Sequence, residues 1–335
     1  MSRLLRTVLA AGAVCISTML ASCDHKDLCY DHNHPVRARI EVDWSQFLEE
    51  VPTGMTVSLF SQDDGSVHTQ LSNNTSYVDV NVSPGMYRAF VFNQSTTEFG
   101  SLTFERMDDM FDATVRAADR ASRWFKARDA NERLVQNPEW FAVGVQSNID
   151  VPKAAAALRH NRADSRSVIA KLTPLCVVYT IHVRIHLRNI YNLRSERASL
   201  DGLADGYRIG IMEPTSTLAT QLLENWTIER DSDNPANGTI RADITSFGLP
   251  YGHQNIPAAN HLLLSVLLVD NKTTLSYDFP VGNAFRTDQG LSLSLSIDQA
   301  IDAPLPDVKP EGGQSGGFDA KVDDWGDEVN IDIGV

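Results

Sequence analysis

The chain has 335 residues, of which 42% are hydrophobic and 21% are charged, so it has an ordinary globular composition and enough length for two domains. Its formal net charge is −14, and its densest basic stretch, residues 116–133, is interleaved with acidic side chains. Nucleic acids and acidic lipid headgroups repel an acidic chain that has no basic patch, so we expect neither as a partner.

Residues 1–22 have the three parts of an export signal peptide. Arg3 and Arg6 form a basic start, an apolar run follows, and small residues end the segment. The apolar run is shorter than the roughly twenty residues that a membrane-spanning helix needs. We therefore expect the segment to be removed from the mature protein.

The end of this segment, Leu20-Ala21-Ser22-Cys23, resembles the lipobox of bacterial lipoproteins. The resemblance implies cleavage between Ser22 and Cys23 and attachment of lipid, including palmitate-type acyl chains, to the Cys23 thiol. Several acyl chains on one residue give stable anchoring, because each buried methylene contributes about 0.8 kcal/mol. The alternative is an ordinary secretory signal that ends near a cysteine.

Residues 23–34 are polar and are expected to be a tether between the lipid and the first strand. They also contain potential metal ligands, namely His25, Cys29, His32 and His34. No second Cys-x-x-Cys pair completes a structural zinc site, so we expect no metal and no cofactor. Whether Cys29 pairs with Cys176, and whether His32 and His34 bind a metal, stays open at this point.

Period-two alternation predicts strands from Pro35 onward. Between Val36 and Trp44, apolar residues alternate with charged ones, which is the pattern of a strand with one buried face. Similar runs separated by Gly, Pro and Asn predict further strands at residues 55–59, 77–82, 86–92 and 140–145. Short strands at this spacing favour an antiparallel β-sandwich, which we assign to residues 35–158.

Residues 95–138 interrupt this rhythm. Phe111, Val115 and Ala118 fall at helical spacing, which predicts a partly helical insertion in the first domain. Such an insertion is either a surface for a specific partner or a loop that fills the end of the sandwich.

A polar stretch at residues 159–167 predicts the domain boundary. A strand follows at residues 175–187, then a short helix at residues 193–200 capped by Asp201-Gly202. Alternation predicts the remaining strands at residues 207–212, 239–244, 261–269, 274–279 and 291–297. We assign residues 165–303 to a C-terminal β-sandwich, so the fold class is all-β with two tandem sandwiches.

Residues 304–335 combine a Pro- and Gly-rich linker with a terminal strand. The strand pattern consists of alternating apolar residues, namely Val329, Ile331, Ile333 and Val335. A strand on a flexible linker needs a sheet edge to join, on its own domain or on a neighbouring subunit. These four residues are therefore the candidate donor strand, and its partner edge stays open.

The chain resembles the fimbrillin-like lipoproteins of the Bacteroidales, in particular the anchor and accessory subunits of surface fimbriae. The motifs that carry the resemblance are LASC with DHKDLC behind it, SPGMYRAFVFN, KLTPLCVVYTIHVRI and the terminal DDWGDEVNIDI. Their order and spacing cover essentially the whole chain. The resemblance implies two transthyretin-like sandwiches, attachment to the outer membrane at the cell surface, and a structural role with other fimbrial subunits as partners.

The resemblance also implies donor-strand exchange, in which a strand of one subunit fills a groove in another. In the stalk subunits an arginine-specific protease removes the first strand. Arg37 and Arg39 lie in the corresponding predicted strand, but an anchor requires an intact connection from lipid to strand. This favours an uncleaved anchor, with a stalk or tip role as the alternative.

The sequence offers no catalytic constellation. Residues 313–317 match Gly-x-Ser-x-Gly, but they lie in the linker without a preceding apolar strand. His182 and His186 share a strand face about 13 Å apart, too far to chelate one ion. We therefore expect no enzyme, and the alternative function is an outer-membrane module that binds glycans or host ligands, with Trp124 and Phe125 as the first candidate contacts.

Overall fold

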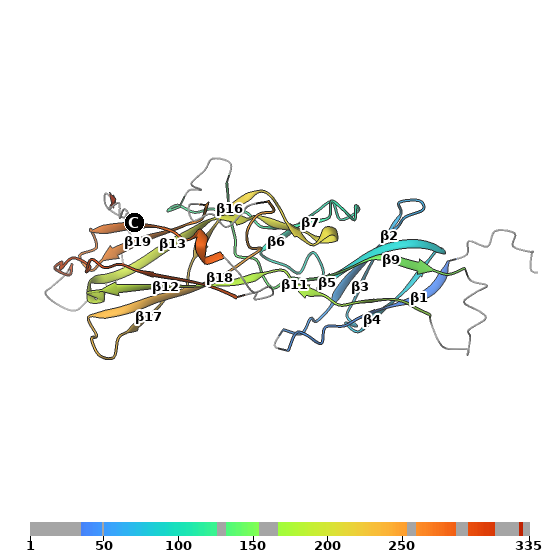
Figure 1. Cartoon of the computed structure of the whole chain (residues 1–335), viewed down its shortest axis with the longest axis horizontal. Helices are drawn as coiled ribbons and strands as arrows, with labels where there is room; N and C mark the ends of the chain where they lie inside the picture. Colours follow the sequence, from blue (N-terminus) through green and yellow to red (C-terminus); the bar gives the residue numbers. More distant parts are fainter. Residues whose placement is uncertain are drawn as a thin grey trace, which may run out of the picture.

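The computed structural model describes residues 35–48, 50–125, 132–153, 167–252, 259–285, 294–311 and 328–330. The described chain is built from strands, with only short 3-10 turns such as η2 (Ile190–Asn192), η3 (Ile209–Ile211) and η5 (Gly282–Phe285) as helical elements. The molecule is elongated, with β1 near one end and β12, β17 and β19 at the other (Figure 1). The predicted all-β class is confirmed.

Two sheets surround the core at the N-terminal end. One has the order β10-β1-β4, with β10 (Ser167–Leu172), β1 (Val36–Val42) and β4 (Tyr77–Val82). The other has the order β11-β9-β5-β2-β3, with β11 (Leu175–Cys176), β9 (Ala142–Val151), β5 (Gly85–Asn93), β2 (Met55–Ser61) and β3 (Val67–Ser72). The apolar faces of both sheets meet in one cluster that includes Ile40, Leu59 and Val80.

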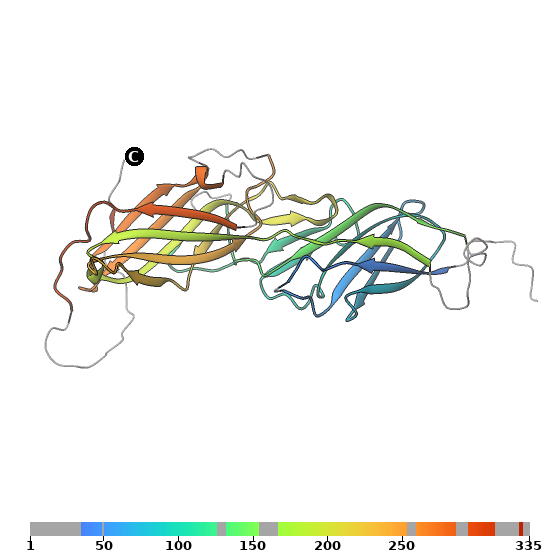
Figure 2. The ribbon, with the colours of Figure 1, turned by 60° about the horizontal axis from the view of Figure 1, so that its bottom comes forward.

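The strand β10 lies with the N-terminal strands although the sequence assigned it to the second half. It pairs in parallel with β1, from Ala38 opposite Ser167 to Val42 opposite Leu172. The chain therefore crosses back along the first sheet before it enters the second half. Figure 2 shows this path, with the green part of the chain passing from the half that holds β1 into the other half.

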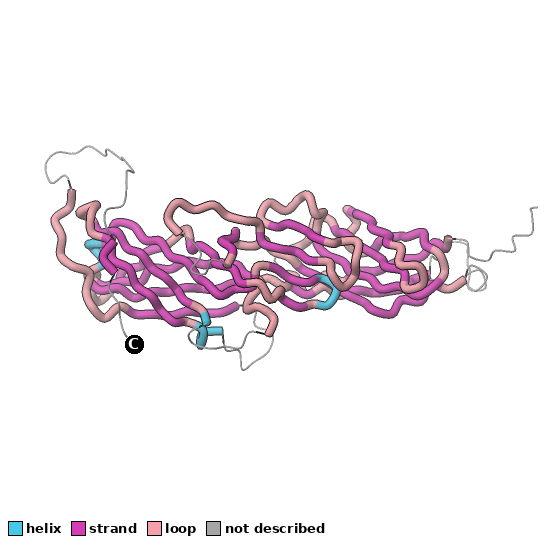
Figure 3. The backbone as a smooth tube through the Cα atoms, turned by 90° about the horizontal axis from the view of Figure 1, so that it is seen from above, coloured by secondary structure: helices cyan, strands magenta, loops and turns pink. Residues whose placement is uncertain are grey.

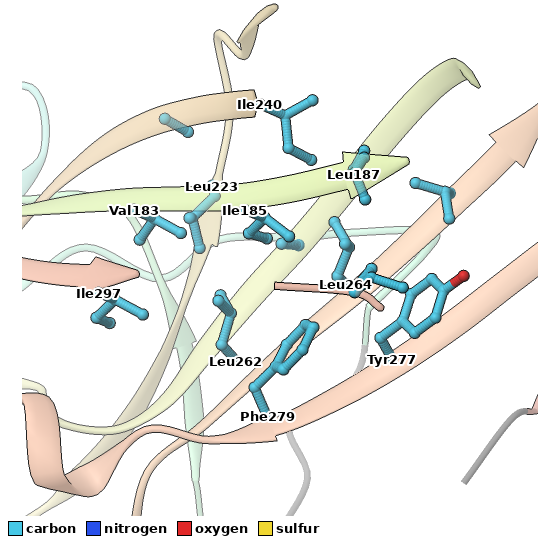
Figure 4. Packing of buried hydrophobic residues seen from close by; sticks show 14 of the residues in the cluster. Val183, Ile185, Leu187, Leu223, Ile240, Leu262, Leu264, Tyr277, Phe279 and Ile297 are labelled. Carbon is cyan, nitrogen blue, oxygen red and sulfur yellow. The ribbon is translucent and has the colours of Figure 1, made fainter. Parts of the chain in front are cut away.

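Two further sheets surround the largest core cluster. One has the order β17-β18-β12-β21, with β17 (Thr227–Arg230), β18 (Asn237–Ser246), β12 (Tyr179–Arg188) and β21 (Ser294–Ala300). The other has the order β22-β20-β19-β13-β16-β8, with β22 (Glu328–Asn330), β20 (Thr274–Pro280), β19 (His261–Leu268), β13 (Leu193–Ala204), β16 (Leu218–Leu223) and β8 (Arg133–Val135). Ile185 from β12 and Leu264 from β19 belong to this core (Figure 4).

The helix predicted at residues 193–200 is wrong, because this segment is the first part of the central strand β13. β13 pairs with β19 on one side and with β16 on the other. Its pairing register shifts between Leu193 and Ser195 and again between Leu200 and Leu203. These irregularities break the period of two that alternation relies on, and Gly202 takes a left-handed φ of 70° inside the second one.

The helical part of the insertion is also not found among the described residues of 95–138. They form β6 (Leu102–Glu105), β7 (Thr114–Ala117), β8 and turns. β6 and β7 continue a small sheet with β14 (Gly206–Arg208) and β15 (Glu213–Pro214), and β8 pairs in parallel with β16. The insertion is thus joined to strands of the second half. Strands run along the whole length of the molecule, and the helical elements are only short pieces (Figure 3).

A third core cluster lies where the insertion meets both halves. It combines Phe90 and Phe92 of β5 with Val115 of β7, Ala219 of β16 and Phe247. Because apolar packing and a shared sheet connect the two halves, the division into two tandem domains at residues 158 and 165 stays a prediction. No helix within the described ranges has both the length and the apolar composition for a membrane crossing.

Candidate assembly site

The predicted attachment residues fall outside the described residues. This applies to Ser22, Cys23 and the tether, and equally to Ile331, Ile333 and Val335 of the candidate donor strand. Of that strand, the structure describes the backbone of β22, which contains Val329. Lipidation at Cys23 and strand donation therefore stay predictions.

The β22 backbone pairs in parallel with β20 of the same chain. Leu275 is the register partner of Val329, and the pairing extends over three residues. β22 is thereby the edge strand of the six-stranded sheet. The β22 segment of the tail thus pairs with a sheet edge of its own chain, over three residues only.

Strand β1 is held on both sides by its sheet. It pairs with β10 in parallel and with β4 in the antiparallel direction. Arg39 donates two hydrogen bonds to the Asp79 carboxylate, at 2.9 and 3.3 Å, and its guanidinium lies 3.7 Å from the centre of the Tyr77 ring. Both the backbone and the side chain of Arg39 are therefore engaged in the folded protein.

The loop after β1 exposes apolar side chains next to an aromatic cluster. Leu48 and Val51 are among the most exposed large apolar residues of the described chain. Beside them, the rings of Trp44, Phe47 and Trp140 contact one another, with centroids 5.3 to 6.5 Å apart. The indole of Trp44 donates a hydrogen bond of 2.9 Å to the Thr75 carbonyl, which holds the start of the loop against the β3–β4 turn.

The aromatic candidates for glycan stacking are not a free platform. Trp124 is half exposed, but the Arg197 guanidinium lies 3.7 Å from the centre of its ring. One face of the indole is therefore covered by a cation. Phe125 is partly buried, and its backbone amide donates a hydrogen bond of 3.1 Å to the Ser122 hydroxyl.

The two histidines of β12 are each paired with a different carboxylate. His182 Nδ1 lies 2.8 Å from Asp243, and His186 Nε2 lies 2.8 Å from Asp298. Within the described ranges, no three His, Cys, Asp or Glu side chains are arranged to hold a metal ion. This geometry agrees with the interpretation that the two histidines are independent side chains on a solvent-facing side of the sheet.

Shifted pKa values give no acid–base pair among the described residues. Burial raises the pKa of Glu196, and burial also raises the pKa of the Cys176 thiol. Cys176 is a free cysteine in the structure, and its proposed partner Cys29 lies outside the described residues. A buried thiol with a raised pKa is a poor nucleophile.

The buried ion cluster around Asp205 is the feature that the sequence did not indicate. Its carboxylate has no exposed surface and receives hydrogen bonds from Arg116, Arg133 and Thr215. Arg116 and Arg133 come from the insertion, 89 and 72 residues away in the sequence. A pattern within a short stretch of sequence cannot predict a contact between residues so far apart in the chain.

Comparison with known proteins identifies relatives over nearly the full length. A protein of Bacteroides ovatus described as "Putative fimbrium anchoring subunit Fim4B" is 21% identical over 339 residues, covering 95% of each chain. A solved "putative adhesin" from Bacteroides ovatus has a TM-score of 0.54 at 15% identity, covering 85% of this chain and 99% of the other, and shows a shared fold. The fimbrial anchor protein Mfa2 from Porphyromonas gingivalis has a TM-score of 0.47 at 12% identity, covering 79% and 90%.

These matches confirm the resemblance to fimbrial anchor and adhesin-like proteins of the Bacteroidales. The match to a family extends over residues 22–224, which is more than half of the chain. The chain therefore belongs to the family described as "Domain of unknown function (DUF5119)".

Proposed function

We propose that this protein is a lipid-anchored cell-surface subunit of a fimbria-like assembly, acting as its anchor or as an accessory subunit. The observation that carries the proposal is the end-to-end match to a fimbrium anchoring subunit, over 95% of both chains. The match extends over nearly the whole length of both chains and is not confined to one sheet pair. The role is structural, with no catalysis.

The attachment is proposed to run through Cys23 to the outer membrane. Support comes from the signal segment and from the four lipobox residues, Leu20 to Cys23. About a dozen polar residues then separate the lipid from β1, which begins at Val36. A tether of this length lets the folded part stand clear of the bilayer surface.

An anchor that keeps its first strand is favoured over a processed stalk subunit. The connection from β1 to β2, residues 43–54, contains no arginine or lysine, and the next arginine after Arg39 is Arg88. Arg39 itself lies in a strand that is paired on both sides. Cleavage by an arginine-specific protease would therefore have to occur within paired β1 backbone, because the connection that follows β1 offers no arginine.

Strand exchange is proposed to use the C-terminal tail. Its alternating Val329, Ile331, Ile333 and Val335 provide one apolar face for a groove in a neighbouring subunit. The three-residue contact between β22 and β20 is short, so a longer partner edge would compete with it effectively. The two sheet pairs are proposed to correspond to the two transthyretin-like sandwiches.

To test this proposal, the full chain and three variants of it are expressed in a Bacteroidales host that makes the assembly. Cys23→Ala should release the protein from the outer-membrane fraction, and deletion of residues 318–335 should leave it in the membrane but remove co-purifying subunits. Cys176→Ala serves as the matched control and should change neither property. The proposal fails if the unmodified protein purifies alone, or if Cys23→Ala stays with the membrane.

A further inference from the structure

A polar cleft lies on the outer face of the sheet β17-β18-β12-β21. The strands β12, β17 and β18 of this sheet lie in the half of the molecule away from β1 (Figure 1). Its volume of about 490 Å³ falls within the range of about 300–1,000 Å³ that is typical of small-molecule sites. The side chains that line it are His182, Val183, Arg184, Glu224, Asn225, Thr227, Arg241, Ala242 and Asp243. The proposed assembly role uses none of them.

Two arginines face each other across the floor of this cleft. Arg184 of β12 and Arg241 of β18 are register partners, and both side chains are exposed on the outer face. Like charges directly opposite on neighbouring strands destabilise a sheet unless an anion lies between them. This pair of positive side chains occurs on a chain whose net charge is −14.

The neighbouring carboxylates are engaged by side chains other than Arg184. Glu229 pairs with Arg241. Asp298 is the register partner of Arg184 on β21, but it is bound to His186 at 2.8 Å. Arg184 makes no ion pair or hydrogen bond with any side chain in the part of the chain that the structure describes. A guanidinium with free donors beside a second guanidinium matches a carboxylate well.

The rim of the cleft selects against a bare inorganic anion. Glu224 and Asp243 line the cleft, and each also pairs with a neighbouring side chain, Arg120 and His182 respectively. A carboxylate oxygen can accept more than one hydrogen bond, so both can still accept from a ligand. A ligand without hydrogen-bond donors, such as sulfate, would meet two carboxylates that it cannot satisfy. A ligand with hydroxyl groups can donate to them, while Asn225 and Thr227 offer neutral polar groups.

We propose that this cleft binds an acidic sugar, with the sugar carboxylate between Arg184 and Arg241 and the hydroxyl groups donating to Glu224 and Asp243. A ligand that combines one anionic group with several hydroxyl donors matches both the arginines of the floor and the carboxylates of the rim. The inference does not depend on the assembly role. It gives this subunit a second property, the recognition of uronic-acid-type saccharides at the cell surface.

To test this, the full mature chain is titrated with D-glucuronate, and binding is measured by calorimetry and by NMR chemical-shift changes. D-Glucose and sulfate are the comparison ligands. Arg184→Gln and Arg241→Gln should each weaken glucuronate binding by about tenfold or more, because a charged hydrogen bond is lost. Arg188→Gln is the matched control, since Arg188 is exposed on the same strand face but does not line the cleft. Circular dichroism confirms that each variant is folded.

The expected result is glucuronate binding that exceeds glucose and sulfate binding and is retained in Arg188→Gln. The proposal is overturned if millimolar glucuronate produces no response. It is also overturned if sulfate binds equally well, or if a folded Arg184→Gln variant binds as tightly as the unmodified protein. Arg184 pairs with no described side chain, so its replacement should leave folding intact and keep the test decisive even if Arg241→Gln unfolds.

Discussion

Arg116 Nη1 lies 2.7 and 2.6 Å from the two carboxylate oxygens of Asp205, a side chain with no exposed surface. Arg116 is in β7 of the insertion, and Asp205 lies between β13 and β14 of the second half. Arg133 of β8 adds a second guanidinium at 2.8 Å. A buried carboxylate thus holds two strands of the insertion against the second half.

Asp205→Asn should destabilise the protein by about 3 kcal/mol, because removing one partner of a buried ion cluster leaves the others unpaired. Equilibrium unfolding in urea, followed by tryptophan fluorescence, measures the change. Asp112→Asn is the control, since its pair with Arg106 is exposed at 45% and 71% and should contribute about 0.5 kcal/mol or less. Equal effects of the two substitutions would contradict the role given to Asp205.

Gly210→Ala should loosen the same junction by steric means. A Cβ atom on Gly210 would lie 1.7 Å from the Met110 carbonyl oxygen, so backbone would have to move. We expect a loss of about 1–3 kcal/mol in the free energy of unfolding. Gly100→Ala is the matched control, because its Cβ would meet only the Glu139 carboxylate, at 3.4 Å. A Gly210→Ala variant as stable as Gly100→Ala would show that the two segments are not in close contact.

The sequence predicted strands well where alternation runs undisturbed. Residues 77–82, 261–269 and 274–279 match β4, β19 and β20 within a residue at each end. It failed at β13, where two register shifts destroy the period, and in the insertion, where β6, β7 and β8 are only three or four residues long. A strand that short shows too few alternations to be distinguished from a helical turn.

Long-range pairing was beyond the sequence for a different reason. The parallel partner of β1 is β10, more than a hundred residues later, and nothing in either strand specifies the other. The Arg184–Arg241 pair has the same origin, because only the register of β12 against β18 places the two side chains opposite each other. The predicted attachment residues, by contrast, depend on local motifs that single-sequence reasoning can read.

Asp43 should make the end of β1 sensitive to acid. Hydrogen bonds from Ser45, and then Lys171, lower the pKa of Asp43 to about 2 from its ordinary value of 3.8. A lowered pKa in the folded state means that the ionised carboxylate stabilises the fold above pH 3.8 and that this contribution is lost as the pH falls towards 2. Asp43→Asn should therefore be less stable than the unmodified protein at pH 7 and equally stable at the acid limit, as measured by urea unfolding at a series of pH values.

NMR titration of the Asp43 carboxyl can separate the contributions of Ser45 and Lys171 to its lowered pKa. Ser45→Ala should raise its pKa more than Lys171→Met does, because the hydrogen bond from the Ser45 side chain is the largest single cause of the lowered pKa. The backbone amide of residue 45 still donates to Asp43 in this variant. The Lys171 amine lies 3.2 Å from the carboxylate in an exposed setting, where water screens it. A larger effect of Lys171→Met would show that the ion pair between Asp43 and Lys171 of β10 dominates instead.

An arginine placed in the β1–β2 connection should turn an intact first strand into a removable one. Gln46 is exposed in the turn after β1, within a loop that lacks arginine. The unmodified chain should yield no fragment that begins after Arg37 or Arg39, because both lie in a strand with partners on either side. Gln46→Arg should be cut by an arginine-specific protease after residue 46, as seen by intact-mass spectrometry. Gln46→Lys is the matched control, with the same charge and a similar length but no arginine to cut.

After cleavage, the short N-terminal piece should stay bound until denaturant is added, because β1 keeps its pairing with β10 and β4. Cleavage of the unmodified chain within β1 under native conditions would contradict the proposal that this subunit keeps its first strand.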